Sequence, residues 1–178
     1  MSPYSDEPDD RDAYRGVTDL LERPPVPINW NVLDAEQAEI EWHDLDLWVK
    51  WLKSTFGLPP NIVPPYWHRH DELVWELSAL HCHWISCYHE SASPSAPIGW
   101  MREFSETRHR LRDWVSICGT RLDRDRPTRQ TTWPGEPPTD AGNEIEIRDR
   151  DKDFVDLVRA DLLSRQRIEA KARQQLTL

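Results

Sequence analysis

Apolar side chains recur at three- and four-residue steps between Trp67 and His89, which places them on one face of an α-helix. Asp71 or His70 stands where the cap of such a helix belongs, and the SASPSAP loop that follows ends it. The apolar face must be buried for the helix to be stable. It consists of Leu73, Leu77, Leu80, Trp84 and the pair Cys87 and Tyr88.

A second helix is predicted ahead of this one, from about Ala35 to Phe56. Asp34 followed by Gln37 resembles an N-cap with its reciprocal partner, and Gly57 with two prolines close behind is a strong stop. The main apolar stripe of this helix is made by Ala38, Trp42, Leu45, Val49, Leu52 and Phe56.

The same helix carries a second apolar stripe. Ile40, Leu47 and Trp51 fall on nearly the opposite side of a helical wheel from the main stripe. Left in water they would form a contiguous apolar patch of roughly a few hundred Å², large enough to be unusual on a monomer. Trp30 with its prolines, the C-terminal helix, a second copy of the chain or a foreign partner could cover it. We expect intermolecular cover, with Trp51 as the anchor.

Two further helices are indicated. The apolar positions between Trp100 and Cys118 predict a third helix that Gly119 terminates, and residues 151–175 predict a weakly amphipathic helix outside the compact core. Residues 144–147 alternate like a very short strand. We therefore expect an all-α fold, with a small three-helix core, a disordered N-terminal tail and a separate C-terminal helix.

Composition supports this division of the chain. Ten tryptophans supply large apolar surfaces to a short chain, while the flanks are polar and contain many of the fifteen prolines. The expected organisation is a disordered acidic, proline-rich tail over 1–33, a helical tryptophan-rich domain over 34–120, a linker over 121–149 and the C-terminal helix over 150–178.

Charge disfavours a general nucleic-acid binder, because the chain has a formal net charge of −10 and phosphate affinity needs clustered bases. Only the segment 91–134 has more bases than acids. Its arginines, Arg108 and Arg112 among them, could contact DNA or an acidic partner, but charge that is solvated or paired within the chain is the favoured interpretation. The absence of an apolar run near 18 residues and the three cysteines favour the cytoplasm, with no membrane contact.

Metal binding and catalysis receive little support. Histidines and cysteines are dense between His68 and His89, but they scatter around the helix and lack the paired spacing of a zinc site. We therefore predict no bound metal and no cofactor. Cys82, Cys87 and Cys118 lie in or at the end of predicted helices, where a cysteine is usually a small buried hydrophobe, so no catalytic residue and no enzyme activity are predicted.

Several motifs resemble an uncharacterised, tryptophan-rich domain family of actinobacteria, over roughly residues 40–120. They are Trp67-His68-x-His70, Glu76-Leu77-x-Ala79-Leu80-x-x-x-Trp84, Pro97-x-x-Trp100 and Arg110-Leu111-x-x-Trp114. The resemblance implies a product of plasmids, integrative elements or phages, often encoded near conjugation or replication functions. It implies no activity and no catalytic residues.

The resulting hypothesis is a non-enzymatic protein-interaction module of an actinobacterial mobile genetic element. It would offer its partners the apolar surface of Ile40, Leu47 and Trp51 and the basic strip of Arg108 and Arg112, or associate with itself. The alternative is a small DNA- or metal-binding accessory factor in replication, conjugal transfer or regulation. Salt-dependent DNA binding by residues 100–130 would favour the alternative.

Overall fold

A computed structural model describes residues 25–128, 130–137 and 142–175. Of the tail expected to be disordered over 1–33, residues 1–24 lie outside the described part, whereas residues 25–33 are described and include the buried Trp30. Within these ranges the chain is predominantly α-helical, as expected. The α-helices are α2 (Ala35–Phe56), α3 (Asp71–Tyr88), α4 (Ala96–Ile117) and α5 (Arg150–Gln175). A 3-10 helix, η2 (Trp67–Arg69), precedes α3, and β1 (Arg124–Asp125) pairs antiparallel with β2 (Ile145–Glu146).

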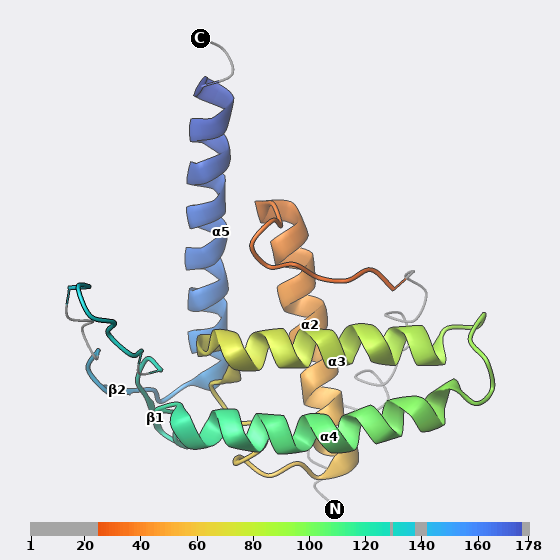
Figure 1. Cartoon of the computed structure of the whole chain (residues 1–178). Helices are drawn as coiled ribbons and strands as arrows, with labels where there is room; N and C mark the ends of the chain where they lie inside the picture. Colours follow the sequence, from red (N-terminus) through yellow and green to blue (C-terminus); the bar gives the residue numbers. More distant parts are fainter. Residues whose placement is uncertain (1–24, 129, 138–141, 176–178) are drawn as a thin grey trace, which may run out of the picture.

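The helices form two pairs that cross each other. The α3–α4 hairpin lies across α2, and α5 stands beside α2 and extends past the rest of the molecule (Figure 1). The two pairs share one core, because α2 contacts both α3 and α5. This arrangement packs both α3 and α5 against α2.

The ends of α2 follow from its local sequence, as predicted. The Asp34 carboxylate accepts a hydrogen bond from the Gln37 amide nitrogen at 2.8 Å, and the Gln37 side chain accepts one from the Asp34 amide nitrogen at 3.1 Å. At the other end Gly57 adopts φ 58°, a left-handed conformation that disfavours any residue with a Cβ. Both ends are therefore closed by local hydrogen bonds.

Indole rings dominate the core. Trp30, Trp42, Trp48, Trp67, Trp84 and Trp100, six of the ten tryptophans, are buried. Their ring contacts form two groups. One joins Trp30, Trp42 and Trp67, with 4.5 Å between the centroids of Trp30 and Trp42. The other joins Trp48, Trp84 and, through Tyr88, Trp100, which lies 4.9 Å from Phe104. Rings of this size let few residues bury a large area, which is how a short chain builds one core across four helices.

The proline-rich connection between α2 and α3 is part of this core. Leu58, Ile62, Val63 and Tyr66 are buried along it. The Tyr66 hydroxyl bonds to the carbonyl oxygen of Ile147 at 3.0 Å. The segment 121–149, expected to be a linker, is thereby fastened to the helices, and its short strand falls within the four residues that alternation indicated.

The C-terminal helix does not stay outside the compact core, which corrects the sequence prediction. Phe154 and Val158 of α5 are buried in the same cluster as Trp42 and Trp67. The Phe154 ring meets Trp42 edge-on at 6.2 Å between centroids. The core thus contains four helices and not three.

Polar side chains hold α5 along the length of α2. The Trp42 indole donates to Asp161 at 3.0 Å, and Glu169 accepts from the amide of Ala35 at 2.8 Å, which caps the first turn of α2. Arg165 donates to the carbonyl oxygens of Trp30 and Leu33 at 2.9 and 2.8 Å. The prediction that this helix lies outside the core counted only its apolar positions. Such a count underestimates a helix contact that polar side chains stabilise.

Candidate functional site

The predicted second stripe forms the outer side of α2, away from the buried main stripe. Ile40 is 39% exposed, whereas Leu47 and Trp51 are half-buried and pack against the edge of the core. The stripe is therefore apolar and accessible, but its exposed area is smaller than that of three side chains left fully in water. Trp30 and α5, two of the candidates to cover it, lie against Trp42 of the main stripe instead.

Trp51 is braced by neighbouring rings from its own chain. Its ring centroid lies 5.1 Å from Trp84, 6.1 Å from Phe56 and 6.4 Å from Trp48. Trp84 in turn lies 5.7 Å from Tyr88, which is 37% exposed at the end of α3. We call the set Ile40, Leu47, Trp51 and Tyr88 the aromatic edge. Its rings are pre-organised by the core behind them.

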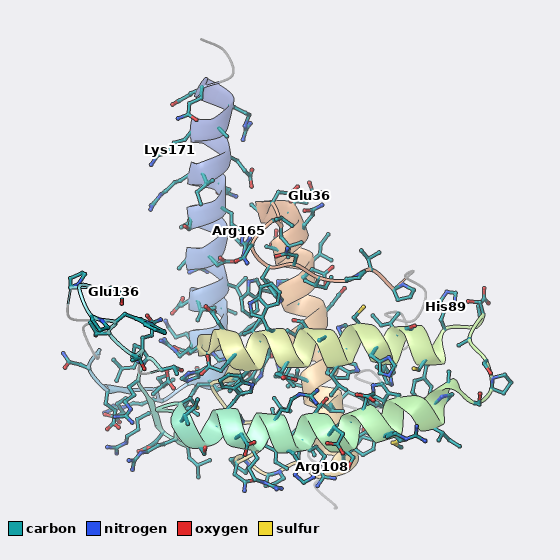
Figure 2. All side chains as sticks on the ribbon, in the orientation of Figure 1. Glu36, His89, Arg108, Glu136, Arg165 and Lys171 are labelled. Atoms are coloured by element: carbon teal, nitrogen blue, oxygen red, sulfur yellow. The ribbon has the colours of Figure 1, made fainter. Side chains whose placement is uncertain are left out.

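The two predicted arginines lie on α4, and one of them borders the same ring cluster. The Arg108 guanidinium lies 5.9 Å from the centroid of Phe104, and Phe104 meets Phe56 at 4.8 Å. Phe56 and Phe104 thus separate Arg108 from Trp51. Arg108 is exposed (Figure 2), and Arg112, also exposed, follows one turn later on α4. The structure therefore places Arg108 beside the aromatic edge rather than within it.

Other arginines of the basic segment pair inside the chain. Arg110 donates to Glu76 at 3.0 Å, and Arg124 bonds both to Asp123 at 3.0 Å and to Glu144 at 3.3 Å. These pairs reduce the positive potential that a phosphate backbone would meet. They agree with the interpretation that part of the arginine run serves intramolecular contacts.

The most chemically suggestive cluster surrounds His70, a residue first noted as a cap or zinc-ligand type. Its side chain makes no cap bond to α3. Instead Nε2 lies 2.8 Å from an Asp125 carboxylate oxygen, and Nδ1 lies 2.8 Å from the Thr128 hydroxyl oxygen. That hydroxyl donates to Glu72 at 2.6 Å. His70 and Asp125 are both buried.

The hydrogen-bond directions in this cluster identify its role. The Thr128 hydroxyl has one proton and gives it to Glu72, so Nδ1 of His70 must donate to Thr128. Nε2 faces the Asp125 carboxylate. Both ring nitrogens of His70 thus have partners within the chain, and the Thr128 proton points to Glu72 and not to His70, so His70 does not act as the base for Thr128. The cluster therefore fastens the 121–128 segment to the start of α3.

A second buried histidine fastens α5. His68 Nε2 lies 2.8 Å from an Asp153 oxygen, and the Arg69 Nε donates to the same oxygen at 2.8 Å. Burial lowers the pKa of His68, so the ring is neutral and donates to Asp153. Burial alone would raise the pKa of Asp153, but the bonds from Arg69 and His68 outweigh it and lower that pKa.

Neither the thiols nor the histidines of the described residues form an evident reactive centre. Burial raises the pKa of the thiols of Cys82, Cys87 and Cys118, which disfavours the nucleophilic thiolate. His83 approaches the Cys87 sulfur at 3.7 Å, and His81 stacks on Trp48. In the described part of the chain, no three His, Cys, Asp or Glu side chains come together as a metal site would require.

The aromatic edge is thus the candidate functional site, and comparisons with other proteins add no further residue to it. No protein-family model, curated protein or solved structure matches this chain. Among residues 25–128, 130–137 and 142–175, none of the helices combines the length and the apolarity needed to span a bilayer.

Sequence reasoning missed three residues that matter to these clusters. Tyr88 was assigned to a buried face, and Asp125 and Asp153 were among the many acids of presumed solvated segments. The only signal was the pair His68 and His70, singled out by residue type. Their partners lie 85 and 55 residues away along the chain, beyond the reach of any spacing rule.

Proposed function

We propose that this protein is a non-enzymatic protein-interaction module that binds a protein partner through its aromatic edge. The observation that carries the proposal is an accessible row of apolar side chains on the outer side of α2, continued by Tyr88 through the rings of Trp51 and Trp84. The assignment to an actinobacterial mobile genetic element rests on the sequence resemblance alone.

The energetic argument concerns Trp51. Interfaces draw most of their affinity from a few aromatic or arginine side chains, and immobilising a free side chain costs about 0.5–1.5 kcal/mol. Contacts with Trp48, Phe56 and Trp84 already hold Trp51 in place. A partner that covers this ring would therefore gain apolar contact with little loss of side-chain freedom.

Arg108 and Arg112 suit the border of such an interface. Interface rims are polar, and charges at a rim mainly set the association rate and its dependence on salt. The proposal therefore assigns affinity to the aromatic edge and steering to the two arginines, which favours a partner whose own rim is acidic.

Site-specific photo-crosslinking in the native host tests this proposal. A benzophenone amino acid would replace Ile40 in one variant, Tyr88 in a second and Ile117, an exposed apolar residue of α4 outside the edge, in a control. The expected result is the same protein adduct from positions 40 and 88, absent from position 117 and lost when Leu47→Glu is added. Adducts that are absent, or equally abundant at position 117, would contradict the proposal.

A further inference from the structure

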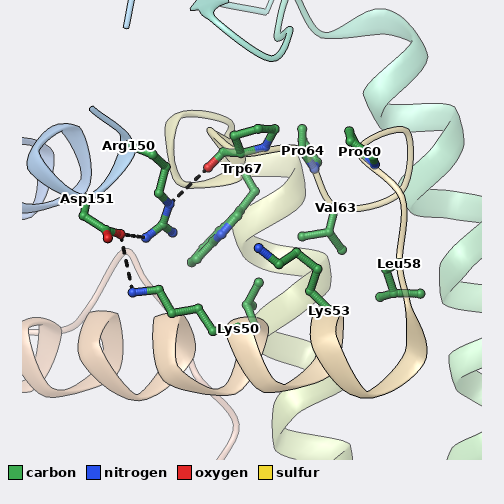
Figure 3. Close-up of a pocket in the computed structure, with 11 residues that line it drawn as sticks. Lys50, Lys53, Leu58, Pro60, Val63, Pro64, Trp67, Arg150 and Asp151 are labelled. Carbon is green, nitrogen blue, oxygen red and sulfur yellow. Dashed lines mark hydrogen bonds and ion pairs between the residues drawn. The ribbon is translucent and has the colours of Figure 1, made fainter. Parts of the chain in front are cut away.

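A cavity of about 390 Å³ opens on the side of α2 that faces the proline-rich connection. It is enclosed by the C-terminal half of α2, residues 58–65 and the first turn of α5 (Figure 3). Its floor is apolar, made by Val49, Leu58, Val63 and Trp67. The volume lies within the range of roughly 300–1,000 Å³ that small-molecule sites occupy.

Three cationic side chains surround this apolar floor. Each nitrogen of the Arg150 guanidinium already donates one hydrogen bond: Nε to the Pro65 carbonyl at 3.3 Å, Nη1 to Asp151 at 2.9 Å and Nη2 to Asp46. Lys50 pairs with Asp46 at 2.9 Å. Arg150 and Lys50 would therefore act on a bound molecule mainly through their positive charge, because their nitrogen atoms already have partners.

Lys53 differs from its two neighbours. It lines the cavity and reaches from α2 toward Trp67 (Figure 3), yet it makes no ion pair with any residue in the described ranges. An ammonium group with three donors beside an apolar cavity is suited to an anionic group on a bound molecule.

Asp151 indicates which anion the rim stabilises. Its carboxylate, 74% exposed, lies between Arg150 and Lys50, at 2.9 and 3.5 Å. The hydrogen bond from Arg150 lowers the pKa of Asp151, and Lys50 adds to this effect against the opposing effect of burial. The rim thus already favours one carboxylate from the chain itself. Its three cations, Lys50, Lys53 and Arg150, outnumber the two carboxylates of Asp46 and Asp151.

We propose that this cavity binds a small monovalent organic carboxylate, whose apolar body rests on Val49 and Trp67 and whose carboxylate is held by Lys53. The rim has one positive charge left uncompensated, which matches one carboxylate and not a dianion. The limited volume favours a body the size of a phenylpropyl group over a long acyl chain. The site is distinct from the aromatic edge, because Lys53 and Trp51 project to nearly opposite sides of α2.

Ligand-observed NMR and calorimetry with 3-phenylpropanoate test the proposal on the full chain, with 3-phenylpropan-1-ol as the uncharged counterpart. The expected result is saturable binding of the acid at millimolar concentration and at least about fivefold weaker binding of the alcohol. Lys53→Gln should weaken binding of the acid by about the same factor, and Lys53→Arg should retain it. The control Lys171→Gln, far along α5, should change nothing.

Asp151→Asn should raise the affinity for the acid, whereas Lys53→Gln should lower it. Removing the internal carboxylate frees Lys50 and Arg150 for the ligand, so binding should tighten by a few-fold, whereas the exposed control Asp156→Asn should leave it unchanged. Thermal melts would verify that each variant is folded. The proposal is overturned if the acid and the alcohol bind equally, if neither binds, or if Lys53→Gln and Asp151→Asn both leave the affinity of the acid unaltered.

Discussion

Replacement of Phe154 by alanine tests how firmly α5 belongs to the core. The ring is only 4% exposed and contacts Trp42 at 6.2 Å, Trp67 at 6.3 Å and His68 at 5.3 Å between centroids. The Arg150 guanidinium lies over the same ring at 5.1 Å. Truncation would leave a cavity lined by side chains from α2, η2 and α5.

The expected loss of stability follows from that burial. Substitutions of buried Phe by Ala reduce the free energy of unfolding by about 3–5 kcal/mol, because transfer and cavity terms add. With a urea m-value of roughly 2 kcal/mol/M, the unfolding midpoint should fall by about 1.5–2.5 M. Tryptophan fluorescence suits the measurement, since Trp42 and Trp67 flank the site.

Val155→Ala is the matched control, because Val155 is the next residue of the same helix and 47% exposed. It should change the free energy of unfolding by no more than about 0.5 kcal/mol. Equal midpoints for the two variants would refute the docking of α5. So would two separate transitions by circular dichroism, since α5 would then melt on its own.

Two further predictions concern the buried histidines. The pKa of His68 is lowered in the folded chain, so the unfolded chain binds more protons once the pH falls below about 6.5. The free energy of unfolding should therefore decline from about pH 7.5 to about pH 5.5. Urea midpoints would reveal this decline, which should be less steep in His68→Gln. An equal decline in that variant would exclude His68 as the cause. Asp125→Ala removes the buried partner of His70 Nε2 and should lower the free energy of unfolding by roughly 1–3 kcal/mol. Asp123→Ala, at an exposed carboxylate, should have no measurable effect, and similar midpoints for the two variants would contradict the structural role of the His70–Asp125 contact.

Local signals were sufficient to predict α2. Its cap, its stop and its main stripe all lie within 24 residues, and each acts through hydrogen bonds or periodicity of short range. The same reasoning identified the second stripe. It could not show that Trp51 leans on Trp84, because the crossing of α2 with α3 is set by the whole core.

The contacts that sequence reasoning missed are polar and distant along the chain. Asp161 and Glu169 look like ordinary exposed acids of a weakly amphipathic helix, yet one bonds the Trp42 indole and the other caps α2. The cavity at Lys53 is likewise formed by three segments that meet only in the fold. Periodicity detects apolar faces, and it has no means of identifying such partners.

The docking of α5 on α2 has a consequence for synthesis of the chain. Trp42 leaves the ribosome more than a hundred residues before Phe154 and Asp161, so the indole surface that α5 will cover stays open for on the order of ten seconds at ordinary elongation rates. During that interval the α3–α4 hairpin, whose contacts are close in sequence, can form first. The docking of α5 then completes the packing around α2, so the finished fold depends on translation through α5.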